Sequence, residues 1–424
     1  MFEILKKIAF QRKYNNNNKC NNRENIEKVK RQIEQSLWGS ISTVNVIVDD
    51  VSRKQTINIL MPDVSPHMSA GPLSILYFSR FLSKTGYHVR LLIDSNKTEE
   101  ELKNVLKQQS NEISQVIDRL EVNQFPLQKN PNVIISSTDM TVATLFNTAY
   151  AAKKIQSYCR DKKFIYFIQD DERAFFPASS LQCIVEESYG FDFYPLFSTE
   201  ILKNFFIKEN IGDIRNKIEH PLSQGCPSNC YLPDFKSFLE RGKKKKFVFY
   251  ARPHVSRNCY EYAMYAIILA TELNIFNSDW DLYGMGFPKN ETLELANGQS
   301  LHLIQNMPLR DYKCMLHTFD VGLSLMATPH PSMPPIDLAL SGCIVVTNSY
   351  KNKTNSTMHD ICENIICAEM SVDGIINALK EAIDKSCNLE QRYKNAKHAN
   401  WPKNWDETFT NEHANWINCI MRTL

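Results

Sequence analysis

At 424 residues, the chain is longer than one hydrophobic core usually serves, so we expect two domains. Hydrophobic residues make up 43% and charged residues 23%, which is the range of ordinary soluble proteins that fold. The formal net charge is only +2, with 49 basic against 47 acidic residues, so the chain lacks the field needed to hold DNA. Nucleic acid is therefore not an expected partner.

Residues 1–50 are predicted to form an extension outside the fold. The start, MFEILKKIAFQRK, has no long apolar run and no small-residue cleavage site, so it does not resemble a secretory signal. No segment reaches the ~18 apolar residues that a membrane span needs. Two interpretations of the start stay open: a short basic amphipathic helix on an anionic membrane surface, or a frayed, solvated end. Residues 14–23, YNNNNKCNNR, are polar and Asn-rich, which predicts a flexible tether.

Residues 51–240 show strand-like runs that alternate with helical patterns. The expected strands are TINILMP, YHVRLLID, NVIISS and FIYFIQ, and helices are expected at PLSILYFSRFLSK, near residues 97–120 and from Thr138. This alternation is typical of parallel βα units whose sheet is covered on both faces. We expect this region to form a Rossmann-like α/β domain.

A polar, highly charged stretch at residues 236–246, KSFLERGKKKK, predicts an exposed connection between two domains. The alternation then restarts with the strands FVFYA, WDLYG, LHLIQN, DVGLSLM, CIVVTN and NIICAE, and with helices from Cys259, from Leu309 and near Asp337. We therefore expect residues 241–400 to form a second Rossmann-like domain. Residues 401–424 are expected to form a helix that returns to the first domain.

The 12 cysteines are spread thinly along the chain, and Cys343 and Cys367 lie within apolar runs. This pattern predicts reduced, buried thiols and a cytosolic location. The CPSNC pair, Cys226 and Cys230, has no second matching pair, so a loop is expected there rather than half of a zinc site.

Ligands of open α/β sheets bind beyond the carboxyl ends of the strands, so candidate site residues are expected at those positions. Arg252 and Arg257 follow the strand FVFYA. Asn258 and Glu261 have the spacing of a capping box, which predicts that a helix begins at Asn258. Two guanidinium groups between a strand end and a helix N-terminus favour a phosphate or diphosphate. The alternative is that they pair with surface acids, although ARPHVSR itself contains none.

A later strand is followed by ATPHPSMPPIDLALSGCIVVTN, which contains four prolines and one carboxylate. Proline suits the first turn of a helix, so Pro334 and Pro335 are predicted to fix the helix start. Asp337 would then lie in the first turn, near the free backbone N–H groups and within reach of a ligand. The alternative is an acid that only complements the helix dipole.

The first domain contributes two further candidates. Gly71 follows the strand TINILMP and the loop DVSPHMSAG, where a glycine lets the backbone approach a ligand closely at a helix start. No G-x-G-x-x-G follows that strand, which disfavours a Rossmann-type epimerase or dehydrogenase. FIYFIQDDERAFFP is predicted to begin with a buried strand that ends in Gln169 and Asp170. Asp170, Asp171 and Glu172 point in different directions there, so no metal site is expected, and Asp171 and Glu172 are expected in a solvated turn.

These segments resemble a known family. The Arg252-x4-Arg257 pair resembles the Arg-x4-Lys pair with which retaining GT-B glycosyltransferases grip a nucleotide-sugar diphosphate, and PPIDLALSGCIVVTN resembles their ribose-binding segment, which carries a Glu. More narrowly, YFIQDDERAFFP, FYARPHVSRNCYE and SLMATPHPSMPPIDLALSGCIVVTNSYKNK are similar to segments of WsaF-type rhamnosyltransferases, which use dTDP-L-rhamnose to build surface glycans. The similarity runs from about residue 56 to residue 400.

The resemblance implies an α/β protein of the GT-B fold, in which the first domain faces the acceptor and the second binds the nucleotide-sugar. It implies that Arg252 and Arg257 bind the diphosphate and that Asp337 meets the ribose-like sugar of the nucleoside. Gly71 would face the diphosphate and the acceptor, and Asp170 would lie near the transferred sugar. Arg252, Arg257 and Asp170 are then the expected catalytic residues. No metal cofactor and no protein nucleophile are expected, because the leaving diphosphate steers the acceptor hydroxyl in this clan.

Two departures from the clan pattern leave alternatives open. The clan often has a Glu eight residues before the ribose-binding acid, but Pro329 occupies that position here, so His330 becomes the candidate for contacting the donor sugar. Asp337 is one methylene shorter than Glu and must lie closer to the ribose or reach it through water. A non-catalytic nucleotide-sugar- or glycan-binding protein and a transferase of another NDP-sugar remain as alternatives. The expected partners are the donor and a glycan acceptor. Two further options stay open: a lipid-linked acceptor, and peripheral contact with the inner face of the cell membrane.

Overall fold

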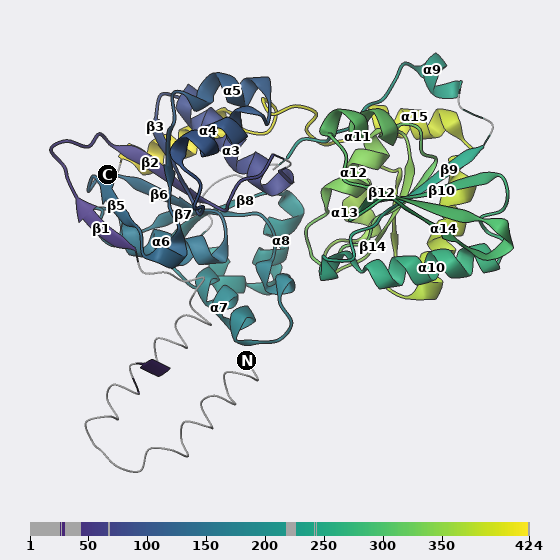
Figure 1. Cartoon of the computed structure of the whole chain (residues 1–424), viewed down its shortest axis with the longest axis horizontal. Helices are drawn as coiled ribbons and strands as arrows, with labels where there is room; N and C mark the ends of the chain where they lie inside the picture. Colours follow the sequence, from purple (N-terminus) through teal and green to yellow (C-terminus); the bar gives the residue numbers. More distant parts are fainter. Residues whose placement is uncertain are drawn as a thin grey trace, which may run out of the picture.

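The computed structural model describes residues 44–66, 68–217, 226–240, 242 and 244–422, together with the separate positions 26, 28 and 29. The Asn-rich stretch and the basic start of the chain lie outside the described residues. Figure 1 shows two α/β lobes side by side, the first coloured purple to teal and the second green, with the final yellow segment reaching back to the first. The expected pair of Rossmann-like domains is therefore confirmed.

A six-stranded parallel sheet forms the centre of the first lobe, in the order β4-β3-β2-β6-β7-β8. The strands are β2 (Thr56–Met61), β3 (His88–Ile93), β4 (Glu121–Gln124), β6 (Met140–Ala143), β7 (Phe164–Ile168) and β8 (Phe193–Phe197). The covering helices are α3 (Ala70–Lys84), α4 (Glu99–Lys107), α5 (Asn111–Ile117), α6 (Phe146–Gln156), α7 (Ser180–Tyr189) and α8 (Glu200–Glu209). Every residue of β2 and β7 is buried, as expected for strands covered on both faces. The strand order reverses between β2 and β6, which is where ligands bind in such sheets.

Two elements of this lobe differ from the sequence prediction. NVIISS forms β5 (Asn132–Ile135), which pairs with β1 (Asn45–Val48) in a separate two-stranded sheet. The helix expected from Thr138 is preceded by the strand β6, because the buried Asp139 carboxylate accepts hydrogen bonds from the backbone of Thr56 and the side chain of Asn58 on β2. These long-range bonds leave no local sequence signal.

The second lobe contains a seven-stranded sheet in the order β11-β12-β10-β9-β13-β14-β15, in which β11 is antiparallel to its neighbour. The strands are β9 (Lys245–Tyr250), β10 (Trp280–Phe287), β11 (Glu291–Glu294), β12 (Ser300–Gln305), β13 (Val321–Leu323), β14 (Ile344–Asn348) and β15 (Ile365–Ala368). The helices are α10 (Tyr260–Glu272), α11 (Leu309–Leu316), α12 (Met333–Leu340), α13 (Asn355–His359), α14 (Val372–Ser386) and α15 (Leu389–Lys397). The strand order reverses between β9 and β13, as it does in the first lobe.

Residues 226–240 pack against the second lobe, although the sequence placed them before the domain boundary. Phe238 in α9 (Phe235–Leu239) is buried and packs against Tyr393. Gly342 has φ +84, and a Cβ at that position would lie 2.4 Å from the Phe238 ring. The predicted linker therefore contains one aromatic residue that anchors it, and the described segment 226–240 belongs to the second lobe.

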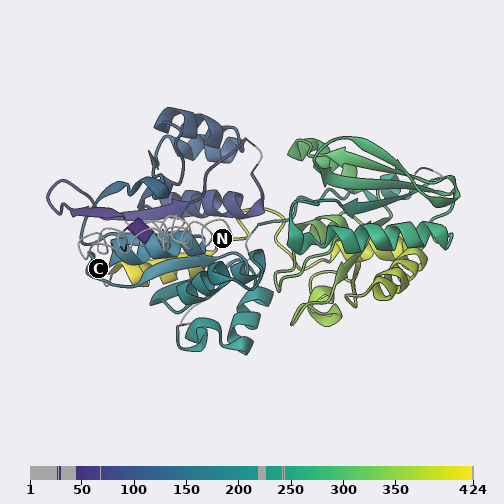
Figure 2. The same cartoon turned by 60° about the horizontal axis from the view of Figure 1, so that its bottom comes forward.

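The C-terminal segment packs on the first lobe. Trp416 and Ile417 in α16 (Asn411–Arg422) are buried in the same cluster as the side chains of β2 and β3. Trp405 stacks on Tyr77 of α3, with ring centroids 4.0 Å apart. In Figure 2 the yellow segment lies beneath the sheet of the first lobe. The chain thus connects the two lobes twice.

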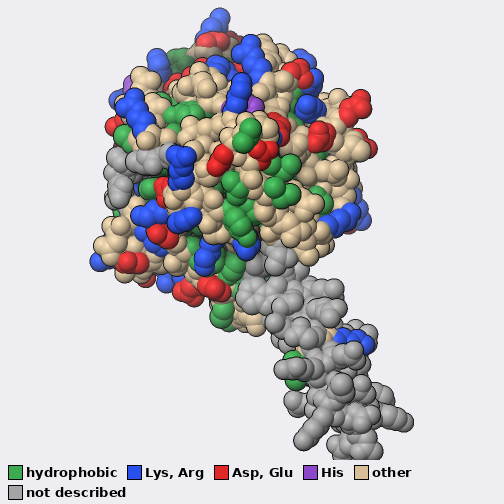
Figure 3. Space-filling model, turned by 90° about the vertical axis from the view of Figure 1, so that its left-hand side faces the viewer, with side chains coloured by type: hydrophobic (Ala, Val, Ile, Leu, Met, Phe, Trp, Pro, Cys, Tyr) green, Lys and Arg blue, Asp and Glu red, His purple; other side chains and the backbone are tan. Residues whose placement is uncertain are grey.

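Charged side chains of both signs are interspersed on the face of the first lobe that Figure 3 shows, in keeping with the small net charge. Within the described residues, no helix has both the length and the hydropathy to cross a bilayer. The described cysteines are free thiols, and Cys343 and Cys367 are buried as expected.

Candidate functional site

A cavity of about 790 Å³ lies between the two lobes, at the carboxyl ends of both sheets. Its walls come from the segments that follow β2 and β7 in the first lobe and β9, β12 and β13 in the second. All the candidates from the sequence line this one cavity: Gly71, Asp170, Arg252, Arg257, His330 and Asp337. Ligand sites in α/β proteins are concave and lie at such strand ends, so this cavity is the candidate site.

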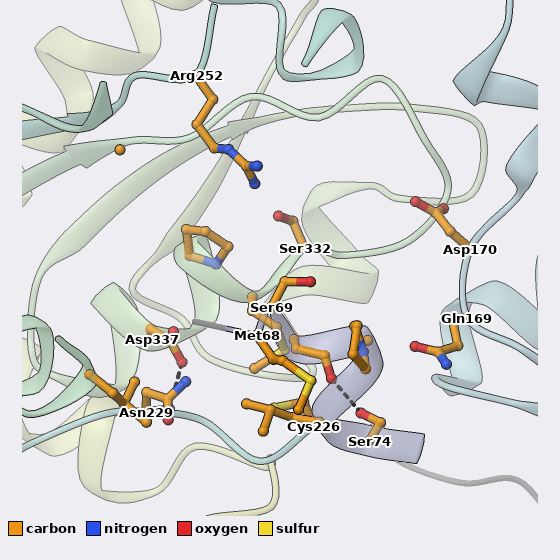
Figure 4. A pocket seen from close by; sticks show the side chains of 18 of the residues that line it. Met68, Ser69, Ser74, Gln169, Asp170, Cys226, Asn229, Arg252, Ser332 and Asp337 are labelled. Atoms are coloured by element: carbon orange, nitrogen blue, oxygen red, sulfur yellow. Dashed lines mark hydrogen bonds between the residues drawn. The ribbon is translucent and has the colours of Figure 1, made fainter. Parts of the chain in front are cut away.

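Arg252 follows the carboxyl end of β9 and extends into the cavity (Figure 4). Its Nη1 donates a hydrogen bond of 3.1 Å to the Tyr250 hydroxyl. Its Nε is buried and has no hydrogen-bond partner among the described residues. Gly286, at φ +91, leaves room for the arginine stem, since a Cβ there would lie 3.2 Å from Arg252 Cγ. The guanidinium group is thus held in place with donor capacity left unused.

Arg257 lies in the short 3-10 turn Ser256–Asn258 and contacts the opposite lobe. Its Nε is 3.8 Å from Asp170 Oδ2, and its guanidinium carbon is 4.3 Å from the centre of the Phe175 ring. This Nε also is buried without a hydrogen-bond partner among the described residues. The acid next to Arg257 therefore comes from a distant part of the chain, which a search of its own segment could not reveal.

The predicted capping box after Arg257 is wrong. Helix α10 begins at Tyr260, and the residue before it, Cys259, has φ +50 and makes no side-chain cap. The Asn258 side chain instead donates a hydrogen bond of 3.4 Å to the Leu325 carbonyl beyond β13. A tertiary hydrogen bond thus replaces the local cap that the spacing indicated, and it ties the Arg257 turn to the neighbouring wall.

Asp170 projects into the cavity from the end of β7, opposite Arg252 (Figure 4). The residue is 9% exposed, and its Oδ1 accepts a hydrogen bond of 2.8 Å from the Asp171 backbone. Burial raises the pKa of Asp170 to about 7, although the Arg257 charge opposes this shift. This carboxyl group can therefore hold or release a proton near neutral pH.

Asp171 and Glu172 do not form the solvated turn that the sequence predicted. Asp171 is 6% exposed and binds Arg173 at 2.9 Å, and Glu172 is 1% exposed. The Glu172 carboxyl accepts a hydrogen bond of 2.8 Å from the backbone of Phe146 at the start of α6. Burial raises the pKa of Glu172 to about 8. The free N–H groups at the helix start and Arg173 compensate for burial of these acids, which support the turn that carries Asp170.

Gly71 lies in the first turn of α3, and its role involves a residue that the sequence did not assign to the site. A Cβ at Gly71 would lie 2.7 Å from Gln169 Oε1. Gln169 also lines the cavity and lies beside Asp170 in Figure 4. The missing side chain of Gly71 therefore makes room for the Gln169 amide.

Asp337 is not in the first turn of its helix, contrary to the prediction. Helix α12 begins at Met333 with prolines in its first turn, so Asp337 lies in the second turn. Its carboxylate is 2% exposed and accepts hydrogen bonds from Ser228 Oγ at 3.0 Å, Asn229 N at 2.7 Å and Tyr312 OH at 3.1 Å. Burial raises the pKa of Asp337 to about 6, although these hydrogen bonds oppose the shift. This acid joins segment 226–240 to the cavity wall in addition to facing the cavity.

His330 and Ser332 form a constrained part of the wall. Ser332 has φ +67, a backbone conformation that is strained for a side chain other than glycine. Its backbone N–H donates a hydrogen bond of 2.9 Å to His330 Nδ1. Burial, with the Lys353 and Arg257 charges, lowers the pKa of His330 to about 3, so the ring is neutral and carries its proton on Nε2. His330 can therefore donate one hydrogen bond from Nε2.

Several lining residues could not have been selected from the sequence, because tertiary packing alone brings them to the site. They are Phe175, Tyr312 and Ser332, whereas Gln169 follows β7 directly and carried the signal of a strand end without being assigned to the site. In the part of the chain that the structure describes, no three His, Cys, Asp or Glu side chains are grouped to hold a metal ion.

Comparison with known proteins identifies two family models. The model of the WsaF N-terminal domain matches residues 56–199, and the model of the WsaF C-terminal domain matches residues 245–380. The O-antigen biosynthesis protein RfbC of Myxococcus xanthus is 26% identical over 257 residues, which are 59% of this chain and 18% of that protein. The chain thus spans less than a fifth of the length of this relative.

Solved structures share the architecture at low sequence identity. Sucrose-phosphate synthase from Thermosynechococcus elongatus has a TM-score of 0.57 and 9% identity, covering 87% of this chain and 99% of its own. HepE from Anabaena, in complex with UDP-glucose, has a TM-score of 0.57 and 11% identity, covering 88% of this chain and 100% of its own. The chain belongs to the WsaF-type glycosyltransferase family, and its two facing Rossmann-like domains form a GT-B fold.

Proposed function

We propose that this chain is an enzyme that transfers a sugar from a nucleoside-diphosphate sugar to a glycan acceptor in the cavity between the lobes. The observation that carries the proposal is the pair Arg252 and Arg257, which line the cavity with buried Nε–H groups for which the described part of the chain offers no acceptor. Buried donors are nearly always hydrogen-bonded in folded proteins. A diphosphate would supply acceptor oxygens to both guanidinium groups.

The expected chemistry needs no protein nucleophile. The bond between C1 of the sugar and the diphosphate oxygen breaks, a bond from the acceptor oxygen to C1 forms on the same face, and the acceptor proton passes to the departing phosphate. Arg252 and Arg257 would stabilise the charge that develops on the diphosphate. The diphosphate would also replace Asp170 as the anion that contacts Arg257. Asp170 would then face the transferred sugar.

The remaining residues have roles in holding the donor. Asp337 would contact the sugar of the nucleoside. A hydroxyl of that sugar would replace the Tyr312 hydroxyl as a hydrogen-bond donor to the Asp337 carboxylate. His330 would donate from Nε2 to a hydroxyl of the transferred sugar, where the clan has a carboxylate. Gly71 would face the diphosphate and the acceptor from the start of α3. These roles are supported by the common cavity that the three residues line.

The donor we propose is dTDP-L-rhamnose, used with retention of configuration, since the chain belongs to the WsaF-type family. The name of the Myxococcus xanthus relative supports a surface glycan as the acceptor. We place the reaction in the cytoplasm, at the inner face of the cell membrane if the acceptor is lipid-linked.

The test incubates the purified chain with dTDP-L-rhamnose or UDP-glucose and an alkyl rhamnoside acceptor. We expect dTDP release that depends on the acceptor, and a product whose new linkage keeps the anomeric configuration of the donor. Tight binding of dTDP-L-rhamnose without dTDP release over an acceptor panel would favour a non-catalytic binding protein. Turnover of UDP-glucose alone would contradict the proposed donor but not the transferase activity.

A further inference from the structure

Lys353 is a buried lysine that lies behind the cavity wall. It has no part in the function proposed above. It follows β14 in a short turn in which Tyr350 and Lys353 exchange backbone hydrogen bonds, and it is 0% exposed. Its Nζ donates a hydrogen bond of 2.7 Å to the Met326 carbonyl. No carboxylate of the described residues forms an ion pair with it. An unpaired buried charge is destabilising, so its presence calls for a compensating role.

The hydrogen bond of Lys353 fixes the segment that carries the cavity wall. Met326 lines the cavity, and its backbone N–H donates a hydrogen bond of 2.6 Å to the Asn348 side chain at the end of β14. The next backbone N–H, that of Ala327, donates a hydrogen bond of 2.7 Å to the Arg257 carbonyl. Lys353 is therefore connected through one short wall segment to the backbone of Arg257.

The same turn also contacts the first lobe. The side-chain amide of Asn352 donates a hydrogen bond of 2.7 Å to the Ile201 carbonyl in α8. The turn that places Lys353 behind the wall is thus supported from both sides of the cavity.

The charge of Lys353 acts on groups of the site. The Lys353 charge helps to lower the pKa of His330. The Asp170 carboxylate in turn favours the protonated form of Lys353. Burial lowers the pKa of Lys353 to about 8, so the side chain is mostly protonated at neutral pH. The thiols of Cys259 and Cys367 also face it, and both have raised pKa values. The positive charge therefore lies behind the cavity with no carboxylate bound directly to it.

We propose that Lys353 is a positioning residue for the donor diphosphate. It fixes the wall segment that holds the Arg257 backbone, and its unpaired charge adds to the positive potential that the diphosphate meets. The inference deepens the proposed function and rests on it, because the anion is the diphosphate of the donor. Binding of the anion would in turn favour the protonated lysine.

The test is calorimetric titration of dTDP at pH 7.5, 8.5 and 9.5 into the wild type, Lys353→Met and Lys351→Met. Lys351 is an exposed lysine of the same turn and is the matched control. We expect wild type and Lys351→Met to lose affinity as the pH rises. We expect Lys353→Met to bind about tenfold more weakly at pH 7.5 and to show a shallower pH dependence than the wild type. His330, with its pKa near 3, lies below this range, and the Cys367 pKa of about 11 lies above it. Asp170, near 7, and Glu172, near 8, also lose protons here in every variant, so the difference in pH slope between the wild type and Lys353→Met is the quantity that reports on Lys353.

Equal affinities and equal pH slopes in wild type and Lys353→Met would overturn the inference while leaving the proposed function intact. If Lys353→Met does not fold, Lys353→Gln takes its place in the same comparison: a shallower pH slope than that of the wild type supports the inference, and an equal slope overturns it. Absence of dTDP binding by the wild type at every pH would contradict the proposed donor site itself, and the inference with it.

Discussion

Arg252 and Arg257 dominate the site at the scale of single residues, because each combines a positive charge with a buried N–H donor that has no partner within the described residues. A charge-assisted hydrogen bond contributes ~1.5–3 kcal/mol, so Arg252→Ala is expected to lower kcat/KM roughly ten- to a hundredfold. Arg252→Lys is the control that keeps the charge but loses the planar fork, and it should recover part of the loss. Steady-state transfer assays measure both variants. Near-normal transfer by Arg252→Ala would contradict the assignment.

Asp337 combines a structural and a binding role, and two variants separate them. Asp337→Asn has one acceptor oxygen in place of two, so it should weaken nucleotide binding and destabilise the fold by about 1–3 kcal/mol. Ser228→Ala removes one hydrogen bond to the same carboxylate from outside the cavity lining. We expect it to lower the melting temperature but to leave nucleotide affinity unchanged. Equal loss of affinity in both variants would make Asp337 a purely structural acid.

Burial of the Glu172 carboxyl group should make the stability of the folded protein decrease as the pH rises. Its pKa is about 8 in the folded protein, above the value of an exposed Glu, so the folded state keeps a proton that the unfolded chain has lost. Stability should therefore fall as the pH rises from about 5 to about 8. Glu172→Gln, which is neutral at every pH, should match the wild type near pH 5 and melt at a higher temperature near pH 8.5. A melting-temperature difference that is the same at both pH values would contradict the buried, protonated carboxyl.

At the scale of elements, the sequence indicated most buried strands, because β2, β7, β9 and β14 each contain a short run of β-branched, aromatic or other apolar residues between turn signals. It failed where tertiary hydrogen bonds decide the local structure. Asp139 holds β6 beside β2, and Asn258 bonds to Leu325 in place of capping α10. The positions of Arg252 and His330 in the cavity followed from strand order and family resemblance. Their distant partners could not be predicted, because no local pattern encodes them.

The C-terminal segment is an element whose packing can be tested directly. Phe409 is 6% exposed, and its ring centre lies 5.2 Å from that of Phe78 and 5.6 Å from that of Phe81, both on α3. Phe409→Ala should lower the free energy of unfolding by about 3–5 kcal/mol, because it opens a cavity in this cluster. Tyr265→Ala, at a tyrosine that is 55% exposed on α10, is the control and should change it by less than about 0.5 kcal/mol. Similar denaturant midpoints for Phe409→Ala and the wild type would show that the segment does not depend on this contact.

At the scale of the whole molecule, the candidate site exists only because two similar lobes present their strand ends to each other. The second lobe contributes the cations Arg252 and Arg257, and the first contributes Asp170 and the start of α3. Arg257 already approaches Asp170 across the cavity, so an incoming diphosphate has to replace an existing contact. Each lobe alone would lack half of these groups.

The most direct test of the account is a crystal structure of the chain with a bound nucleoside diphosphate. We expect the guanidinium groups of Arg252 and Arg257 to lie ~2.7–2.9 Å from phosphate oxygens, with the Arg257 contact to Asp170 replaced. A structure in which both guanidinium groups point into solvent, or in which the diphosphate lies outside the cavity, would contradict it.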